Sequence, residues 1–278
     1  MSKIKSVLAG ILAVLFLAAF SGTAWAGIMP GQLLDAGRFN GFEGTIDGQY
    51  KIRMLLFPKD NKIVGSYFYE AYETKIKLTG FHDGDNITLY EYDDEGNVAG
   101  TFSGAIAGKW HIFSGVWQGK KDNSRYNFSM ELRSTFPGRP DNLYIEAGAR
   151  STEEVERFAR ELKNDILNKN KSRVAEKIHL PINVFVDGQL VDVRSQQEFV
   201  ELFDKIFYDD YVKAIAKCFP LNMSSSYRGI MFGDKGQIWL NYVFQKRASD
   251  AKLWVTALNN NPKNMAYFLQ DPIFHEAD

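Results

Sequence analysis

The stretch Phe113–Gly119, FSGVWQG, places a glycine two residues before a large aromatic side chain. The same spacing occurs in IVGSYFY, Ile63–Tyr69, and in VAGTFSG, Val98–Gly104. Residues two apart in a strand lie on the same face, so each glycine would lie beside its aromatic ring. Glycine inside a strand usually marks a bend or a close approach of a neighbouring backbone. The repeat therefore predicts a curved sheet or small barrel, in which the rings fill the space that the glycines leave.

Residues 41–133 alternate between apolar and polar side chains with a period of two. In the segment YKIRMLLF, Ile52 and Met54 alternate with Lys51 and Arg53, which predicts a strand with one buried and one solvated face. Turn-forming residues separate such segments about every 10 to 13 residues, as in an antiparallel meander. We expect an antiparallel, barrel-like β-domain here. About seven or eight strands would suffice to close it, but the pattern does not decide closure.

The β-domain loosely resembles the lipocalin type of antiparallel barrel, on the strength of the three glycine and aromatic segments. That resemblance implies an aromatic-lined cup with a ligand inside. The alternative is that the same rings pack against each other and fill the interior.

Residues 134–150 contain two prolines and two glycines and show no sustained period, which predicts a linker. From 151 to 278 the pattern becomes helical in places. Ser151 with Glu154, and Ser195 with Glu198, form capping-box patterns before apolar stripes, so a helix is expected after each serine.

The other elements expected in residues 151–278 are a short helix and several strands. The short helix is predicted over Lys171–Ile178, and Cys218 lies in a further apolar helical pattern. Hairpin turns are predicted at Asp187-Gly188 and at Asp234–Gly236, with a last strand around LWVTAL. The chain as a whole is expected to be α+β.

The segments AEKIHLPINVFVDGQ, SQQEFVELFDKIF and YRGIMFGDKGQIWL resemble the NTF2-like superfamily, which includes the SnoaL-like polyketide cyclases. The resemblance covers about the last 130 residues and implies an α+β cone with a pocket between the long helix and the concave sheet. The alternative is that the same aromatic residues fill the core. The residues that would line such a pocket are Phe185, Phe207, Tyr227, Met231, Trp239, Tyr242 and Trp254.

Catalytic candidates are few. His179 precedes Leu180-Pro181 and is the weak candidate for a general base; the alternative is that it caps a helix or is exposed. Asp187 has a conformational explanation in its turn, and Asp192 could pair with Arg194. Enzymes of the resembled superfamily use an Asp with a His or Tyr in the pocket, and no such motif occurs here at a recognisable spacing.

No metal or cofactor is expected. The four histidines lack paired spacing, no phosphate-binding glycine loop occurs, and a Gly-x-Ser-x-Gly elbow is absent. The single cysteine, Cys218, excludes an intrachain disulfide. Stability must therefore come from packing.

Residues 1–26 have the pattern of a secretory signal peptide. Lys3 and Lys5 precede an apolar run from Val7 to Phe20, and small residues then lead to Ala26, so cleavage is expected before Gly27. Removing this segment changes the formal charge from −1 to −3, because it deletes two lysines and no acid. A nucleic-acid partner is not expected, and neither is a membrane span after cleavage. We expect a periplasmic or secreted bacterial protein.

Three classes of function fit these observations. The leading hypothesis is a non-catalytic protein that binds a small apolar ligand or an envelope protein. The second is an isomerase, dehydratase or hydrolase of the cone type. The third is an inhibitor or immunity-type partner of a secreted enzyme, because SSSYRG at 224–229 invites comparison with the loops of secreted lysozyme inhibitors. The sequence determines neither the ligand nor whether the protein forms a dimer.

Overall fold

The computed structural model describes residues 34–244 and 251–275. The chain divides into two compact units, Met1–Gln32 and Leu33–Asp278, and every described residue belongs to the second unit. The predicted signal peptide, 1–26, lies outside the described residues. No helix in the described part of the chain has the length and apolar character that a membrane span requires.

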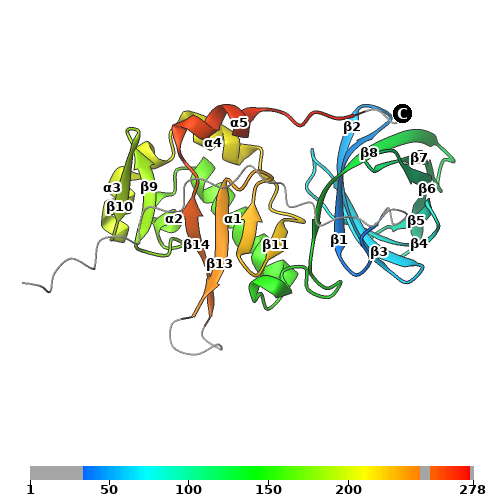
Figure 1. The fold of residues 1–278 in the computed structure, drawn as a ribbon, viewed down its shortest axis with the longest axis horizontal. Coiled ribbons are helices and arrows are strands. Elements are labelled where there is room, and N and C mark those ends of the chain that lie inside the picture. Colours follow the sequence, from blue (N-terminus) through cyan, green and yellow to red (C-terminus); the bar gives the residue numbers. More distant parts are fainter. Residues whose placement is uncertain (1–33, 245–250, 276–278) are drawn as a thin grey trace, which may run out of the picture. The chain divides into compact units, whose positions relative to one another are not determined.

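Eight antiparallel strands form a closed barrel in sequence order (Figure 1). Their bounds are β1 Phe39–Ile46, β2 Tyr50–Lys59, β3 Lys62–Tyr69, β4 Ile76–Asp83, β5 Asn86–Tyr92, β6 Val98–Ala107, β7 Ile112–Gly119 and β8 Arg125–Phe136. Each strand pairs with the next, which confirms the predicted meander. Closure, which the pattern left open, comes from the pairing of β1 with β8, which runs from Phe39 with Phe136 to Ile46 with Phe128 and shifts register once, between Gly41 and Phe42.

Two rings of the glycine and aromatic repeat, Tyr67 and Phe102, fill the inside of this barrel together with Phe113 and Phe128, whereas the third ring of the repeat, Trp117, is half-buried. Phe102 packs edge-on against Tyr67 and Phe128, each with 5.3 Å between ring centroids, and Phe128 lies 4.8 Å from Phe113. All four rings are buried. Because these side chains pack against each other in the interior, the rings fill this part of the barrel and do not line an open cup.

The glycines allow this packing because the strands approach closely where they lie. Gly104 is the register partner of Gly115 on the neighbouring strand. A Cβ atom on Gly115 would overlap the carbonyl oxygen of Ser103 and the Cα of Gly104. A Cβ on Gly104 would likewise meet backbone atoms of Ser114 and the ring of Phe128. Both positions therefore need glycine for steric reasons.

The rest of the chain combines five α-helices with two small sheets among its described residues. The helices are α1 Thr152–Leu167, α2 Lys171–Ala175, α3 Gln196–Ile206, α4 Asp209–Ala216 and α5 Met265–Leu269, with 3-10 turns η1 Ile145–Ala147 and η3 Pro262–Asn264. The strands are β9 Ile182–Val186, β10 Gln189–Val193, β11 Ser224–Ser226, β12 Gly229–Phe232, β13 Ile238–Val243 and β14 Lys252–Leu258. Strands β9 and β10 form one sheet, and β11 to β14 form the other in sequence order.

Most local predictions for this half of the chain are confirmed. The hydroxyls of Ser151 and Ser195 accept hydrogen bonds from the backbone N–H of Glu154 and Glu198, so both predicted caps are present. Both predicted hairpins form. The helical pattern assigned to Cys218 is wrong at that residue, because α4 ends at Ala216 and Cys218 follows it as a buried side chain.

One hydrophobic core includes the helices, the four-stranded sheet and the outer face of the barrel. Phe39, Leu55 and Phe57 of the barrel belong to it, together with Leu143 and Tyr144 of the predicted linker. Tyr144 is fully buried. The predicted linker, 134–150, thus includes the end of β8 and residues that pack into the core. The placing of domain boundaries at 133, 150 and 278 remains a prediction.

Candidate functional site

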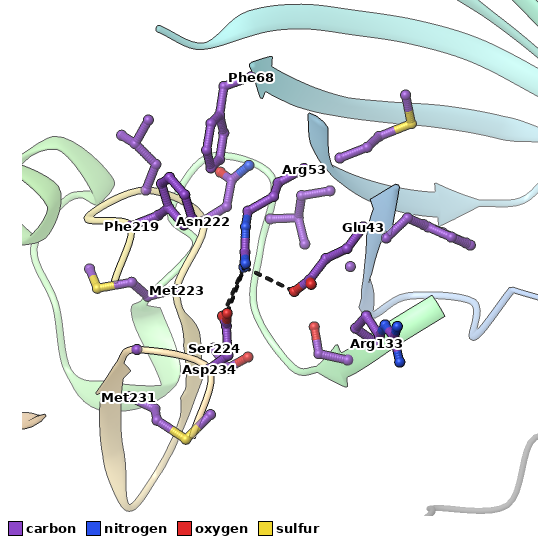
Figure 2. A pocket seen from close by; sticks show the side chains of 17 residues that line it. Glu43, Arg53, Phe68, Arg133, Phe219, Asn222, Met223, Ser224, Met231 and Asp234 are labelled. Carbon is purple, nitrogen blue, oxygen red and sulfur yellow. Dashed lines mark hydrogen bonds and ion pairs between the residues drawn. The ribbon is translucent and has the colours of Figure 1, made fainter. Parts of the chain in front are cut away.

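A cavity of about 140 Å³ lies where strands β1, β2, β3 and β8 of the barrel meet the segments 219–224 and 231–234 (Figure 2). We call it the seam cavity. Its wall is mixed, because charged side chains from both halves alternate with methionine, leucine and phenylalanine. The residues that line it are Gly41, Phe42, Glu43, Arg53, Met54, Leu55, Phe68, Arg133, Ser134, Phe219, Leu221, Asn222, Met223, Ser224, Met231, Gly233 and Asp234.

Arg53 is the central charged group of the seam cavity. Its Nη1 lies 2.9 Å from Glu43 Oε1, and its Nε lies 2.8 Å from Glu70 Oε1. Its Nη2 lies 2.9 Å from Asp234 Oδ2, so the guanidinium joins the barrel to the turn between β12 and β13 (Figure 2). The guanidinium carbon also lies 4.5 Å from the ring centroid of Phe219. One cation thus holds three carboxylates, with a π face on one side.

The burial of Arg53 departs from the sequence prediction. Alternation in β2 correctly places Ile52 and Met54 inside the barrel and Arg53 outside it, but the outer face was expected to be solvated. The side chain of Arg53 is only 15% exposed, because residues from Phe219 onward cover it. Burial acts to lower the pKa of Arg53, but the charges of Asp234 and Glu43 outweigh it and the net shift is upward. Arg53 therefore remains charged.

Glu43 is the group in the seam cavity whose protonation changes near neutral pH. Burial raises its pKa to about 7, with Asp234 adding to the rise and Arg53 opposing it. Its Oε1 accepts a hydrogen bond from Arg53. Within residues 34–244 and 251–275, its Oε2 accepts none. Glu43 lines the cavity and thus has one oxygen without a protein partner among these residues.

Arg133 forms another part of the cavity wall and contacts the C-terminal segment, residues 273–275. Its Nη1 lies 3.0 Å from Glu131, its Nη2 donates to the carbonyl of Ile273, and its guanidinium lies 4.8 Å from the ring of Phe274. His275 then pairs with Glu131 at 3.1 Å and stacks on Trp110. Residues 273–275 therefore lie along β8 beside the cavity wall.

The structure does not bring the predicted pocket residues together in one cavity. Met231 lines the seam cavity. Phe207 and Tyr242 are buried in the core, whereas Tyr227 is 79% exposed at the β11–β12 turn. The half-buried members are Phe185, Trp239 and Trp254. Whether any of them contacts a ligand remains a prediction.

The catalytic candidates lie in ordinary structural contacts. The backbone N–H of His179 donates to Val255, and its ring lies 5.9 Å from Trp254 in an edge-to-face arrangement. Asp187 pairs with Lys205 at 2.6 Å. Asp192 pairs with Arg194, as the sequence suggested. Among the described residues, no group of three or more His, Cys, Asp or Glu side chains could hold a metal ion.

Sequence reasoning missed Glu43, Arg133 and Asp234 as site residues. Asp234 was assigned only to a turn, and Glu43 occupies an outward position in its strand. A charged residue on the outer face of a strand is normally solvated, so nothing local distinguishes these from their neighbours. The available signal is the composition of β2, in which the large apolar residues Leu55 and Phe57 follow Arg53 on the same outer face.

The fold and the site define a closed antiparallel barrel that shares a polar, methionine-rich cavity with an α/β region. Compared with known proteins, the chain matches no protein-family model and no curated protein.

The charge state of Glu43 predicts a pH-dependent gain in stability for Glu43→Gln. Between the ordinary pKa of 4.5 and the folded value of about 7, the unfolded chain loses the Glu43 proton while the folded chain keeps it. Stability therefore falls as pH rises through this window. Glutamine removes that loss, so the variant should exceed the wild type by on the order of 2 to 3 kcal/mol at about pH 8, and match it at about pH 4.

Urea unfolding at several pH values measures this difference. The matched control is Glu161→Gln, which makes the same change on an exposed residue of α1 and should shift stability little at any pH. If Glu43→Gln were more destabilising at about pH 8 than at about pH 4, ionised Glu43 would be a net stabilising partner of Arg53 and the argument would be wrong.

Proposed function

We propose that the protein is an exported, non-catalytic binding protein of the bacterial envelope, and that the seam cavity holds a small ligand. The observation that carries this proposal is the cavity itself, with a volume of about 140 Å³ and a wall of both polar and apolar side chains. Ligand sites commonly combine apolar walls with a few convergent polar groups. An apolar cavity of about 150 Å³ accommodates benzene, so the ligand has about five to seven non-hydrogen atoms.

The finer fold assignments belong to the same proposal. We retain an NTF2-like architecture for residues 151–278 as a hypothesis, supported by the order of two helices, a hairpin, two further helices and a sheet. The lipocalin-like resemblance is supported by eight antiparallel strands in sequence order. The packed interior of the barrel argues for a ligand outside the barrel, in the seam cavity.

Binding is tested by a thermal-shift screen and native mass spectrometry of residues 27–278 against small alcohols, amines, carboxylates and aromatic compounds. Ser134→Met should fill the cavity and abolish the shift, because Ser134 lines it. Ser129→Met makes the same change at an exposed position of the same strand and should leave binding intact. If no compound binds, or if Ser134→Met binds as the wild type does, the proposal fails. Loss of binding in Trp239→Ala alone would place the ligand at the pocket predicted from sequence.

Export predicts a defined amino terminus. The mature protein should begin at Gly27, because the small residues before it fit signal peptidase. Mass spectrometry of the protein from a periplasmic or culture-medium fraction measures this. An intact Met1 on protein that stays in the cytoplasm would contradict export.

A second candidate, binding of another envelope protein, is favoured by the turn between β11 and β12. Tyr227 is 79% exposed there, and the Nε of Arg228 donates to its hydroxyl at 3.1 Å. Tyrosine and arginine are the residue types that most often dominate protein interfaces. Co-purification of a partner that is lost in Tyr227→Ala, with the thermal-shift screen negative, would favour this candidate.

A further inference from the structure

The seam cavity has more negative than positive charge near it. Arg53 is surrounded by Glu43, Glu70 and Asp234. Arg133 does not restore the balance, because Glu131 already neutralises it at 3.0 Å. With Glu43 ionised, the Arg53 cluster therefore carries a net charge of −2, and with Glu43 protonated it carries −1.

The polar atoms that remain for a ligand include both acceptors and donors. Oε2 of Glu43 has no hydrogen-bond donor within the described ranges 34–244 and 251–275, and Ser134 and Ser224, whose hydroxyls can donate or accept, also line the cavity. The Nε of Arg133 is a buried donor without a partner in the same ranges, whereas the guanidinium of Arg53 has its Nε and both Nη atoms engaged with carboxylates. The excess of carboxylates over cations therefore decides for a ligand with positive charge and against an anion.

The apolar part of the wall suits a short apolar body. Phe68 contributes to it from the barrel, beside Arg53, and Leu221, Met223 and Met231 contribute from the other half of the chain. Methionine side chains adapt to small apolar groups of irregular shape. The volume limits the body to about four or five carbon atoms, by comparison with a cavity that holds benzene.

We propose that the ligand is a small organic cation, a primary ammonium with a short alkyl body, which binds at Glu43 Oε2 in exchange for the proton of that carboxyl group. This inference rests on the proposed binding function. In the exchange the O–H bond of Glu43 breaks, its proton passes to solvent, and an N–H of the cation donates to Oε2. The cluster keeps the same net charge of −1, because one positive charge replaces another.

Binding of the cation and binding of the Glu43 proton compete, so the affinity for the cation must depend on pH. Burial raises the pKa of Glu43 to about 7 in the free protein, so below that pH the cation must displace a proton and above it the site is already ionised. Affinity for the cation should therefore rise about tenfold between pH 6 and pH 8 and then level off. Proton release should be close to one per ligand at about pH 6 and small at about pH 8.5.

The experiment is isothermal titration calorimetry of the wild-type protein with n-butylammonium, in buffers of different ionisation enthalpy. 1-Butanol and butyrate serve as probes of the same size with neutral and negative head groups. We expect n-butylammonium to bind at least about tenfold more tightly than either of these probes at about pH 8. Its binding should release close to one proton per ligand at about pH 6 and few protons at about pH 8.5. Glu43→Gln should weaken n-butylammonium at least about tenfold and change 1-butanol less than about twofold.

The outcomes separate the two proposals. If 1-butanol binds as tightly as n-butylammonium, or n-butylammonium binds without proton release at about pH 6, the cation inference is overturned while the cavity still binds a ligand. Preferential binding of butyrate overturns it in the same way. If none of the probes binds, and the wider screen is also negative, the binding function itself fails. Proton release is measured on the unmodified protein, so the test does not depend on the folding of Glu43→Gln.

Discussion

Arg53→Met is expected to lower the free energy of unfolding by about 3 to 5 kcal/mol, because it removes one partner of several buried ion pairs. Glu43 and Glu70 would lose their guanidinium partner while their side chains stay 13% and 25% exposed. Methionine matches the apolar stem of arginine as far as about the position of Nε, so the packing of the stem is kept and the loss reports mainly the removal of the guanidinium. Urea or thermal unfolding measures it, and the loss should grow with pH as Glu43 ionises.

Two variants make the Arg53 result interpretable. Arg139→Met makes the same substitution at an exposed pair, where Arg139 and Asp141 are 58% and 75% exposed, and should change stability by no more than about 0.5 kcal/mol. Arg53→Lys keeps the charge but cannot reach three carboxylates in the planar geometry of a guanidinium, so its loss should be intermediate. A loss for Arg53→Met no larger than for Arg139→Met would show that the cluster contributes nothing net.

Gly115→Ala is expected to destabilise the barrel by about 3 kcal/mol or more, although it adds a single methyl group. The new Cβ would overlap the Ser103 carbonyl and the Gly104 Cα, and neither is the flexible end of a side chain. The strands β6 and β7 would have to separate at this point. The expected result is a lower unfolding midpoint, with loss of the near-ultraviolet circular dichroism of the packed rings.

Val116→Thr is the control for this glycine. It lies next to Gly115 on the outer face of the same strand, is half-buried, and replaces one β-branched residue by another. It should cost about 1 kcal/mol or less. Equal effects at the two positions would mean that β7 tolerates no substitution and that the close approach at Gly115 is not the cause.

The elements that the sequence predicted are those whose signals are local. Alternation in a strand and a capping serine act on residues within a few positions, so the barrel strands and the helices after Ser151 and Ser195 follow from the printed sequence. Closure of the barrel was not predictable, because alternation is the same in an open and a closed sheet. The helix α5, of five residues, is too short to show a period.

The seam cavity could not be predicted because its members are far apart in the chain. Asp234 reaches Arg53 across 181 residues. Whether an outward arginine of a strand is solvated or buried depends on what covers that strand, and pattern reasoning assigns it to water by default. The aromatic pattern of residues 151–278 predicted a pocket in that half of the chain, where the structure places Phe207 in the core.

The pairing of β1 with β8 has a consequence for how the protein folds. Phe39 pairs with Phe136, so the last ladder to close joins residues 97 positions apart, whereas the other seven ladders join neighbours along the chain. Contacts between distant residues carry a large loop-closure entropy and slow the search. Until β8 is available, the first strand has an unpaired edge, which is the part of a β protein most prone to pair with another molecule. A chain that emerges amino terminus first would therefore be most prone to aggregate just before residue 136, and the finished barrel would be largely free of that hazard.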